Sequence, residues 1–229
     1  MKIPLSDRLR SCCNFIAPGD RVADVGCDHG YLGIWLLTQG IASFVFASDV
    51  REGPLQSARR NAQKYGTAEK MSFHLSDGVQ KLPRDFDTLV CAGMGGDTMI
   101  SILEAAPWLQ SNQYRLVLQC QSKTPMLRGY LSEKGWRITE EAVLRDGKFL
   151  YTVMEVYWEP EYPRLTPAQT YFPPALMENP GEALPDYYQW VIGGLEIATA
   201  HQNAPVKEQI LAELQALAEH HPWLKEESA

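Results

Sequence analysis

Short apolar runs alternate with helical patterns along most of the chain, and this alternation restricts the fold more than any other feature of the sequence. Apolar, β-prone runs occur at residues 21–25, 44–47, 71–75, 88–91 and 115–118. Helical patterns occur between or after these runs, at residues 32–37, 55–65, 98–105 and 127–131. Strands that alternate with helices form parallel sheets covered on both faces, and their continuous apolar character fits burial on both sides. The alternation therefore predicts an α/β fold.

The last two β-prone runs predict a different ending for the sheet. One begins at Gly135 and the other covers residues 149–158, with the turn dipeptide Asp146-Gly147 between them. This antiparallel hairpin would complete a mostly parallel sheet of seven strands. Rossmann-like S-adenosylmethionine (SAM) methyltransferases end in this way, whereas dinucleotide dehydrogenases normally continue with parallel strands. We therefore expect the class I SAM methyltransferase fold, preceded by a short helix at residues 5–16.

The chain changes in character after residue 158. Seven of the fifteen prolines lie between residues 159 and 186, which predicts an extended connector. Two helical patterns follow, at residues 187–202 and 206–219, with a break at Asn203, Ala204 and Pro205. A short break between two apolar stripes predicts an antiparallel helical hairpin or coiled coil. We expect a sheet domain at residues 1–158, then the connector and hairpin at residues 159–229.

The net charge of −7 is distributed unevenly between these parts. Residues 1–158 hold 18 Lys and Arg against 17 Asp and Glu, a balance of +1, and residues 159–229 hold 3 against 11, a balance of −8. A polyanionic partner is therefore expected to bind the first part. Scattered surface charge is the alternative to local basic patches, whose candidate members are Arg8, Arg10, Arg51, Arg59, Arg60, Lys64, Lys123 and Arg128.

The cysteines argue against a disulfide framework and against a zinc site. Cys12, Cys13, Cys27, Cys91 and Cys120 are odd in number, lie in apolar segments and have no C-x-x-C spacing. We expect reduced thiols and no structural metal. No stretch approaches the ~20 apolar residues of a membrane helix, and the first residues lack an apolar signal region. The expected protein is soluble and cytoplasmic, and a monomer or weak dimer.

The strongest candidate for a ligand site is the turn after the first predicted strand. Ligands of open α/β sheets bind at the carboxyl ends of the strands, and Gly26 and Gly30 allow a close approach to the backbone. Asp24 and Asp28 flank the turn, and carboxylates repel a pyrophosphate but attract the sulfonium and α-ammonium groups of SAM. The turn therefore favours SAM over NAD, with a tight turn and a helix-capping aspartate as the alternative. Three neighbours are further candidates for ligand contacts: Cys27, His29 and Tyr31.

Three other strand ends carry residues that suit the same ligand. Asp49, followed by Val50, can accept hydrogen bonds from both ribose hydroxyls, although dinucleotide enzymes have a similar acid. Asp77 and Gly78 follow the third strand, where an adenine amino group would bind, or form an ordinary Asp-Gly turn. The Gly-Met-Gly-Gly segment at residues 93–96 follows the fourth strand and is expected to be a loop that leaves room for a substrate base. The alternative is that its glycines serve only the backbone conformation of the loop.

These motifs resemble the bacterial tRNA (adenine N1)-methyltransferase family that modifies position 22 of tRNA. The resemblance rests on Asp-Val-Gly-Cys-Asp-His-Gly-Tyr-Leu at residues 24–32, Gly-Met-Gly-Gly at residues 93–96, Leu118-Gln119 at a strand end, and a helical C-terminal appendage. It covers essentially the whole chain. It implies a Rossmann-like domain, a coiled-coil hairpin, SAM as cofactor and tRNA as partner, with N1-methyladenosine as product. One departure is Cys120-Gln121, where relatives often have Pro-Asn.

The expected reaction requires alignment more than proton transfer. Adenine N1 carries a lone pair and no proton at neutral pH, so it can attack the methyl group without a general base. We expect Asp28 to stabilise the developing charge, and Gly93 or Met94 to contact the base. The expected cofactor ligands are Asp24, Gly26, Cys27, Asp28, His29, Tyr31, Asp49, Val50, Asp77, Gly78 and Gly93. The expected RNA contacts are Arg8, Arg10, Arg51, Arg59, Arg60, Gly95, Gly96, Gln119 and Gln121.

Some interpretations stay open at this point. Tyr187, Tyr188 and Trp190 are expected to contact the sheet domain, with an RNA-stacking surface as the alternative. A SAM-dependent methyltransferase of a small molecule or protein would share every cofactor residue. A non-catalytic RNA-binding protein could retain the same fold. An NAD-linked oxidoreductase is disfavoured by the acidic turn and the terminal hairpin.

Overall fold

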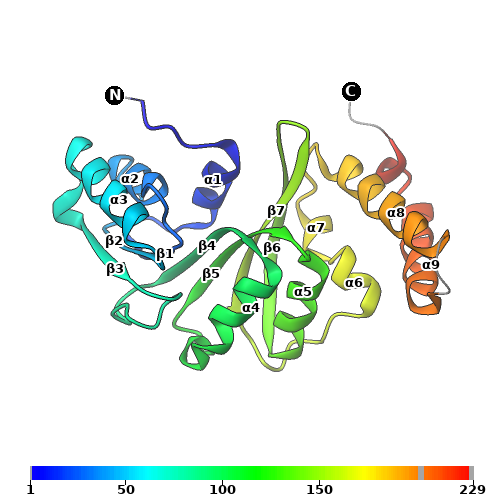
Figure 1. Ribbon diagram of the computed structural model, residues 1–229. Helices are drawn as coiled ribbons and strands as arrows, with labels where there is room; N and C mark the ends of the chain where they lie inside the picture. The colour runs from blue at the N-terminus through cyan, green and yellow to red at the C-terminus, as the bar shows by residue number, and fades with distance from the viewer. Residues whose placement is uncertain (1, 201–203, 227–229) are drawn as a thin grey trace.

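A computed structural model describes residues 2–200 and 204–226 of the chain. Within these residues, seven strands form one sheet in the order β3-β2-β1-β4-β5-β7-β6 (Figure 1). The strands are β1 (Arg21–Val25), β2 (Phe44–Asp49), β3 (Met71–Leu75), β4 (Thr88–Gly95), β5 (Arg115–Ser122), β6 (Trp136–Asp146) and β7 (Phe149–Trp158). β7 is antiparallel to both β5 and β6, and the other pairs are parallel. The predicted Rossmann-like sheet and its terminal hairpin are confirmed.

Helices cover both faces of the sheet. They are α1 (Asp7–Cys12), α2 (Tyr31–Thr38), α3 (Glu52–Lys64), α4 (Gly96–Glu104) and α5 (Thr124–Glu133), with 3-10 turns at Cys13–Phe15, Ala68–Lys70 and Pro107–Leu109. α1, α2 and α3 lie on one face, and α4 and α5 on the other (Figure 1). The central strand β5 contributes to the apolar core on each face of the sheet. Leu116 and Leu118 pack under α4 and α5, whereas Val117 packs under α1 to α3. Because all three side chains are fully buried, this strand is apolar on both faces.

Two central strands are longer than predicted. β4 continues to Gly95 and β5 to Ser122, and these two residues are partners in the ladder. The register shifts on both sides of Met94, so the Gly-Met-Gly segment is the bulged end of β4. Gly96 is the first residue of α4. The prediction that this segment is a loop is wrong, because the pairing with β5 carries the strand through its glycines.

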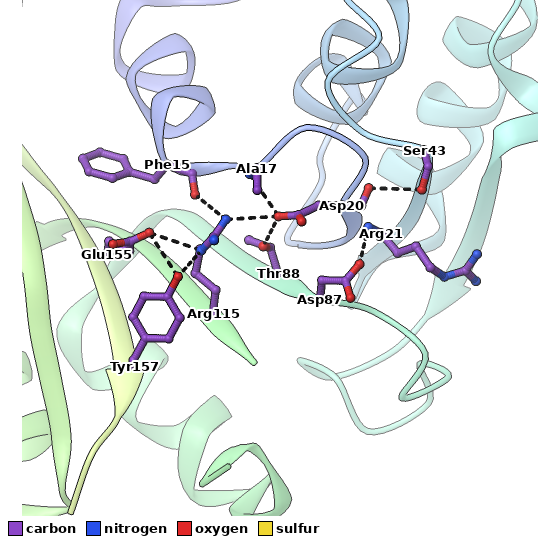
Figure 2. Close-up of polar contacts among 10 residues, drawn as sticks. All are labelled: Phe15, Ala17, Asp20, Arg21, Ser43, Asp87, Thr88, Arg115, Glu155 and Tyr157. Carbon is purple, nitrogen blue, oxygen red and sulfur yellow. Dashed lines mark hydrogen bonds and ion pairs between the residues drawn. The ribbon is translucent and has the colours of Figure 1, made fainter. Parts of the chain in front are cut away.

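A polar network orders the amino ends of the strands (Figure 2). Arg115, the first residue of β5, donates to Asp20 Oδ2 (3.2 Å), to the carbonyl of Phe15 (3.2 Å) and to Tyr157 Oη (2.6 Å). Asp20 Oδ2 also accepts a hydrogen bond from Oγ1 of Thr88, the first residue of β4 (2.6 Å). The network therefore fixes the N-terminal segment against β4 and β5 at the edge of the sheet opposite the predicted ligand site.

The C-terminal part forms a helical unit with its own apolar core. It contains α6 (Pro167–Tyr171), α7 (Ala175–Glu178), α8 (Leu184–Ala200), α9 (Pro205–His220) and a 3-10 turn at Pro222–Lys225. The prediction of an extended connector is wrong for much of residues 159–186, because buried Ala168, Phe172 and Leu176 fix α6 and α7 in this core. The predicted helix pair is present as α8 and α9 (Figure 1). The predicted helix end at Gln202 and Asn203 lies outside the described residues.

A buried ion pair joins this helical unit to the sheet domain. Arg128 of α5 is fully buried and donates to both carboxylate oxygens of Glu141 on β6 (2.6 and 3.1 Å). It also donates to the carbonyls of Thr170 and Tyr171 and to Tyr187 Oη. Burial opposes the charge, but Glu141 and Tyr187 hold the pKa of Arg128 above its ordinary value. Arg128 is therefore a structural link, and its assignment to a surface basic patch is wrong.

All five cysteines are buried free thiols, as predicted. Burial raises the pKa of the Cys91 thiol to about 12, which leaves it protonated at neutral pH. In the described ranges, no helix is long and apolar enough to cross a membrane. Residues 2–200 and 204–226 also contain no group of three His, Cys, Asp or Glu side chains placed to hold a metal ion.

Candidate active site

The turn between β1 and α2 contains a buried carboxylate that lacks one hydrogen-bond partner. Asp24 is 4% exposed and accepts a hydrogen bond from the backbone of Gly33. Its Oδ2 atom is buried and has no partner among the described residues. Burial raises the pKa of Asp24 to about 7; the Gly33 hydrogen bond opposes this rise and Asp49 adds to it. A cation beside Oδ2 would supply the missing partner and favour the ionised carboxylate.

This turn contacts the end of β4 through Gly26 and Met94. Gly26 has a φ of +72°, and a Cβ atom on it would lie 2.3 Å from Met94 Cε. The left-handed backbone conformation therefore disfavours a larger residue at position 26, and such a residue would also require the flexible end of Met94 to move. Asp28 is also left-handed (φ +48°) and exposed, with its Oδ2 atom 3.6 Å from His29 Nε2. The Cys27 thiol lies in the apolar core under α2, so only its backbone faces the turn.

The ends of β2 and β3 continue this acidic edge. Ser48 O accepts hydrogen bonds from the backbone N–H groups of Gly26 and Cys27 (2.8 and 2.9 Å), and Ser48 Oγ donates to Gly78 O (3.2 Å). These bonds join the three strand ends. Asp49 is 6% exposed, and its Oδ1 atom accepts a hydrogen bond from the backbone N–H of Arg51 (2.9 Å). Asp77 and Val50 are exposed beside it. The structure thus brings three of the four predicted acids, Asp24, Asp49 and Asp77, to the ends of β1, β2 and β3.

Gln119 organises the other side of the site. It is fully buried, and its Oε1 atom accepts from Gly93 N (3.0 Å) and from Arg8 Nη1 (2.5 Å). Gly93 has a φ of +80°, and a Cβ atom on it would lie 3.1 Å from Arg8 Nη1. Arg8 of α1 therefore covers Gly93 and is half-buried. The buried amide oxygen of Gln119 holds the Arg8 guanidinium at this side of the site, and the RNA contact of Arg8 stays a prediction.

The other predicted RNA-binding arginines are exposed on or near α1 and α3. Arg10 lies over the Trp35 ring (5.4 Å) and Arg59 over the Phe73 ring (4.9 Å). Arg51 Nε is 3.8 Å from Asp49 Oδ1, and Arg60 donates to Ser57 Oγ. A hollow of about 540 Å³ has only cations among its charged lining residues in the described chain, namely Lys2, Arg10 and Lys64. This hollow is a local basic patch between the N-terminal segment, α1 and α3, and it contains Arg10 and Lys64 of the predicted members.

Residues 5–154 match a family model described as a methyltransferase domain. The chain belongs to this methyltransferase family. The tRNA (adenine(22)-N(1))-methyltransferase of Bacillus subtilis is 30% identical over 154 residues, which are 67% of this chain and 65% of that enzyme. The chain therefore spans slightly less than two thirds of the length of that curated relative.

Solved structures resemble this protein over nearly the whole chain. Streptococcus pneumoniae Sp1610, a candidate tRNA (m1A22) methyltransferase, was solved in complex with S-adenosyl-L-methionine. It matches with a TM-score of 0.81 and 30% identity, over 92% of this chain and 99% of that chain. A Streptococcus agalactiae protein of the NADB-Rossmann superfamily matches with a TM-score of 0.83 and 28% identity, over 94% of this chain and 98% of that chain. The predicted resemblance and fold class are confirmed.

Two features of the structure carry little signal in the sequence. The hydrogen bond between Arg8 and Gln119 joins residues 111 positions apart, and no local pattern indicates it. Among the aromatic residues at the base of the helical hairpin, Tyr187 is buried and contacts Arg128 of the sheet domain, as the favoured interpretation predicts. Tyr188 is buried inside the helical unit, where its hydroxyl donates to Leu214 O. Trp190 is instead 64% exposed.

Proposed function

We propose that this protein transfers the methyl group of S-adenosyl-L-methionine to N1 of an adenine in tRNA, at position 22. The observation that carries this function is the partnerless Oδ2 atom of buried Asp24, beside a strand edge that holds two further acids. Similarity to the Bacillus subtilis enzyme and to the SAM complex of Sp1610 supports it. A dinucleotide would bring a pyrophosphate to the same acidic edge, where the carboxylates would repel it.

The residues present fit SAM. The α-ammonium group is a cation of the kind that Asp24 Oδ2 lacks, and the ribose hydroxyls are donors for the Asp49 carboxylate. Asp77, at the end of β3, is placed for the adenine amino group. When bound, SAM supplies a methyl group activated by a positively charged sulfur. Cys27, His29, Tyr31, Val50 and Gly78 remain predicted contacts of the same molecule.

The chain's own contribution to the reaction is alignment. Adenine N1 attacks with its own lone pair, so no side chain has to remove a proton. Gly93 lacks a Cβ atom beside the guanidinium of Arg8, and Gln119 holds both of them by hydrogen bonds to a single oxygen atom. These three residues therefore fix the edge along which the base approaches. The reaction leaves a positive charge on the base, and we assign its stabilisation to the exposed carboxylate of Asp28.

The test is methylation of unmodified tRNA transcripts by the purified protein with SAM. Nucleosides are mapped by mass spectrometry, and the expected product is N1-methyladenosine at position 22. A transcript with guanosine at that position is the control and should stay unmodified. Calorimetric SAM binding without any methylated tRNA would refute the proposed substrate and favour a small-molecule or protein substrate. Absence of SAM binding would refute the proposed cofactor.

The proposed substrate also suggests where and how the protein acts. Since tRNA is the substrate, we expect the protein to act in the cytoplasm. We expect a monomer or weak dimer, because one chain carries all the residues assigned above. Sedimentation velocity at several protein concentrations would test this expectation.

A further inference from the structure

A groove of about 800 Å³ separates the sheet domain from the helical unit. We call it the aromatic groove. One side is formed by the end of β5, the start of α5 and the tip of the β6–β7 hairpin, and the other by α8 with Lys207 of α9. Figure 1 shows the tip of the β6–β7 hairpin projecting beyond the rest of the sheet, between α1 and α8 in this view. The groove is therefore built from segments that lie far apart in the sequence.

The aromatic groove exposes large rings that the protein core does not use. Trp190 of α8 is 64% exposed and Phe149 at the hairpin tip is 56% exposed, and both line the groove. Tyr151 lies along the same strand, with its ring centroid 6.3 Å from that of Phe149. Exposed aromatic faces on both walls are the kind of surface on which unstacked nucleobases bind.

The charge of the aromatic groove is opposite to that of the helical unit. Among the described residues, the charged side chains that line it are all lysines, namely Lys123, Lys148 and Lys207. Lys207 is one of only 3 Lys and Arg in residues 159–229, against 11 Asp and Glu. Lys123 also forms an ion pair with exposed Asp97 (2.5 Å), for which a phosphate would compete. Lysines beside aromatic rings fit a polyanionic strand better than an apolar helix of another protein.

The aromatic groove leads directly to the edge where the base is methylated. Gln121 and Ser122, which line the groove, follow Gln119 in β5 by two and three positions. Tyr151, on the adjacent strand, has its ring centroid 6.0 Å from the guanidinium carbon of Arg8. Arg8 in turn covers Gly93. A strand lying in the groove would therefore place its next nucleotide at the catalytic edge.

We infer that the aromatic groove binds unpaired nucleotides that flank the target adenine of the RNA substrate. Trp190 and Phe149 stack on the bases, and Lys148 and Lys207 contact the phosphates. This inference rests on the proposed RNA methylation and assigns part of the substrate site to the helical unit. Although residues 159–229 carry a charge of −8, the one charged residue that they contribute to the lining of the groove, among the described residues, is Lys207.

The test measures tRNA affinity, SAM affinity and single-turnover methylation for Trp190→Ala and Phe149→Ala. Each variant should bind tRNA about 5- to 150-fold more weakly, the equivalent of one base stacked on an aromatic ring, with SAM affinity unchanged. Trp190→Phe should retain most of the affinity. Tyr162→Ala is the matched control, because Tyr162 is also an exposed aromatic residue (43%) but lies outside the groove. Its tRNA affinity should equal that of the wild type.

A salt titration tests the phosphate contacts separately. For the double variant Lys148→Gln/Lys207→Gln, the slope of log K against log salt should be smaller in magnitude by about 1.4 to 1.8 than in the wild type. If both aromatic variants bind tRNA as tightly as the wild type does, the inference about the groove is overturned. The proposed function would still stand in that case, provided that the wild type methylates tRNA. A change in sedimentation of the variants without a change in tRNA affinity would instead assign the groove to contact between copies of the chain. If the wild-type protein does not methylate tRNA, the proposed function itself is refuted.

Discussion

Asp24 gives the sharpest quantitative prediction, because its carboxylate is buried without a full set of partners. Its pKa is about 7 in the folded protein, against an ordinary value of 3.8 that applies to the unfolded chain. Between these values the folded protein holds a proton that the unfolded chain has released. The contribution of Asp24 to the free energy of unfolding therefore falls as the pH rises from about 4 to about 7. The total loss is roughly 4 kcal/mol at 1.36 kcal/mol per pKa unit.

The perturbation is Asp24→Asn, which keeps the shape of the side chain and removes its titration. The assay is urea denaturation of both proteins without cofactor at pH 5.0 and pH 8.5. The wild type should lose about 2.7 kcal/mol more than the variant between these two pH values, because only the two pH units between 5.0 and the folded pKa of about 7 contribute. Any constant cost of burying the amide cancels in this difference, as does the titration of carboxylates that the two proteins share. Equal pH dependence in the two proteins would show that the Asp24 carboxyl is not perturbed by burial.

The same carboxylate links SAM binding to protons. A cation beside Oδ2 lowers the pKa of Asp24, so SAM binding near pH 6.5 should release a proton from the wild type and none from Asp24→Asn. Calorimetry in two buffers with different ionisation enthalpies measures this release. The variant should also bind SAM roughly 10- to 150-fold more weakly at pH 8, equivalent to a charged hydrogen bond of about 1.5–3 kcal/mol. Equal proton release by both proteins would place the cation elsewhere.

Three further predictions follow from the described contacts. Asp49→Ala should weaken SAM binding by roughly 10- to 150-fold in calorimetry, and unchanged affinity would remove Asp49 from the cofactor site. Gln119→Leu should lower the single-turnover methylation rate by about 10- to 100-fold with SAM affinity retained, because Gly93 and Arg8 lose their shared acceptor; an unchanged rate would contradict its positioning role. Arg128→Met should reduce the free energy of unfolding by about 3–5 kcal/mol in urea, since it leaves Glu141 buried and unpaired, and a second substitution, Glu141→Leu, should restore part of that loss.

The strands of this fold could be predicted where burial decides their sequence. β1, β3 and β7 have the predicted bounds, because each is a β-prone run that ends beside a polar or turn residue. β4 and β5 extend past their predicted ends because Gly95 and Ser122 pair with each other. Glycine and serine have low intrinsic strand preference, so this part of the ladder depends on the partner strand. Helix α6 has a local signal, because Thr166 and Gln169 form a capping box and Pro167 lies in the first turn, but the high proline content favours an extended connector instead. The four-residue helix α7 has no side-chain cap.

The acidic edge could be predicted from topology, whereas the direction of individual arginine side chains could not. Asp24, Asp49 and Asp77 each follow or end a parallel strand, and such ends meet at one edge of the sheet. Arg8 and Arg128 look like ordinary surface cations in their helical patterns. Each instead reaches an acceptor that is buried by other segments, Gln119 for Arg8 and Glu141 for Arg128. A helical pattern shows on which side of the helix a residue lies, but it does not show which distant residue its side chain will contact.

The contacts of Arg128 also bear on how the aromatic groove holds its shape. Arg128 uses all five of its N–H groups, on β6, on α6 and on Tyr187 of α8. A rotation of α8 against α5 would therefore break the buried hydrogen bond from Arg128 to Tyr187 Oη and leave a charged donor unpaired. Lys123 directly precedes α5, and Trp190 lies one helical turn after Tyr187 in α8. The two walls of the groove are thereby held in fixed relation to the catalytic edge. A preformed groove avoids the entropy cost of ordering its walls on binding, so RNA affinity should depend on Arg128 even though this residue is inaccessible to the RNA.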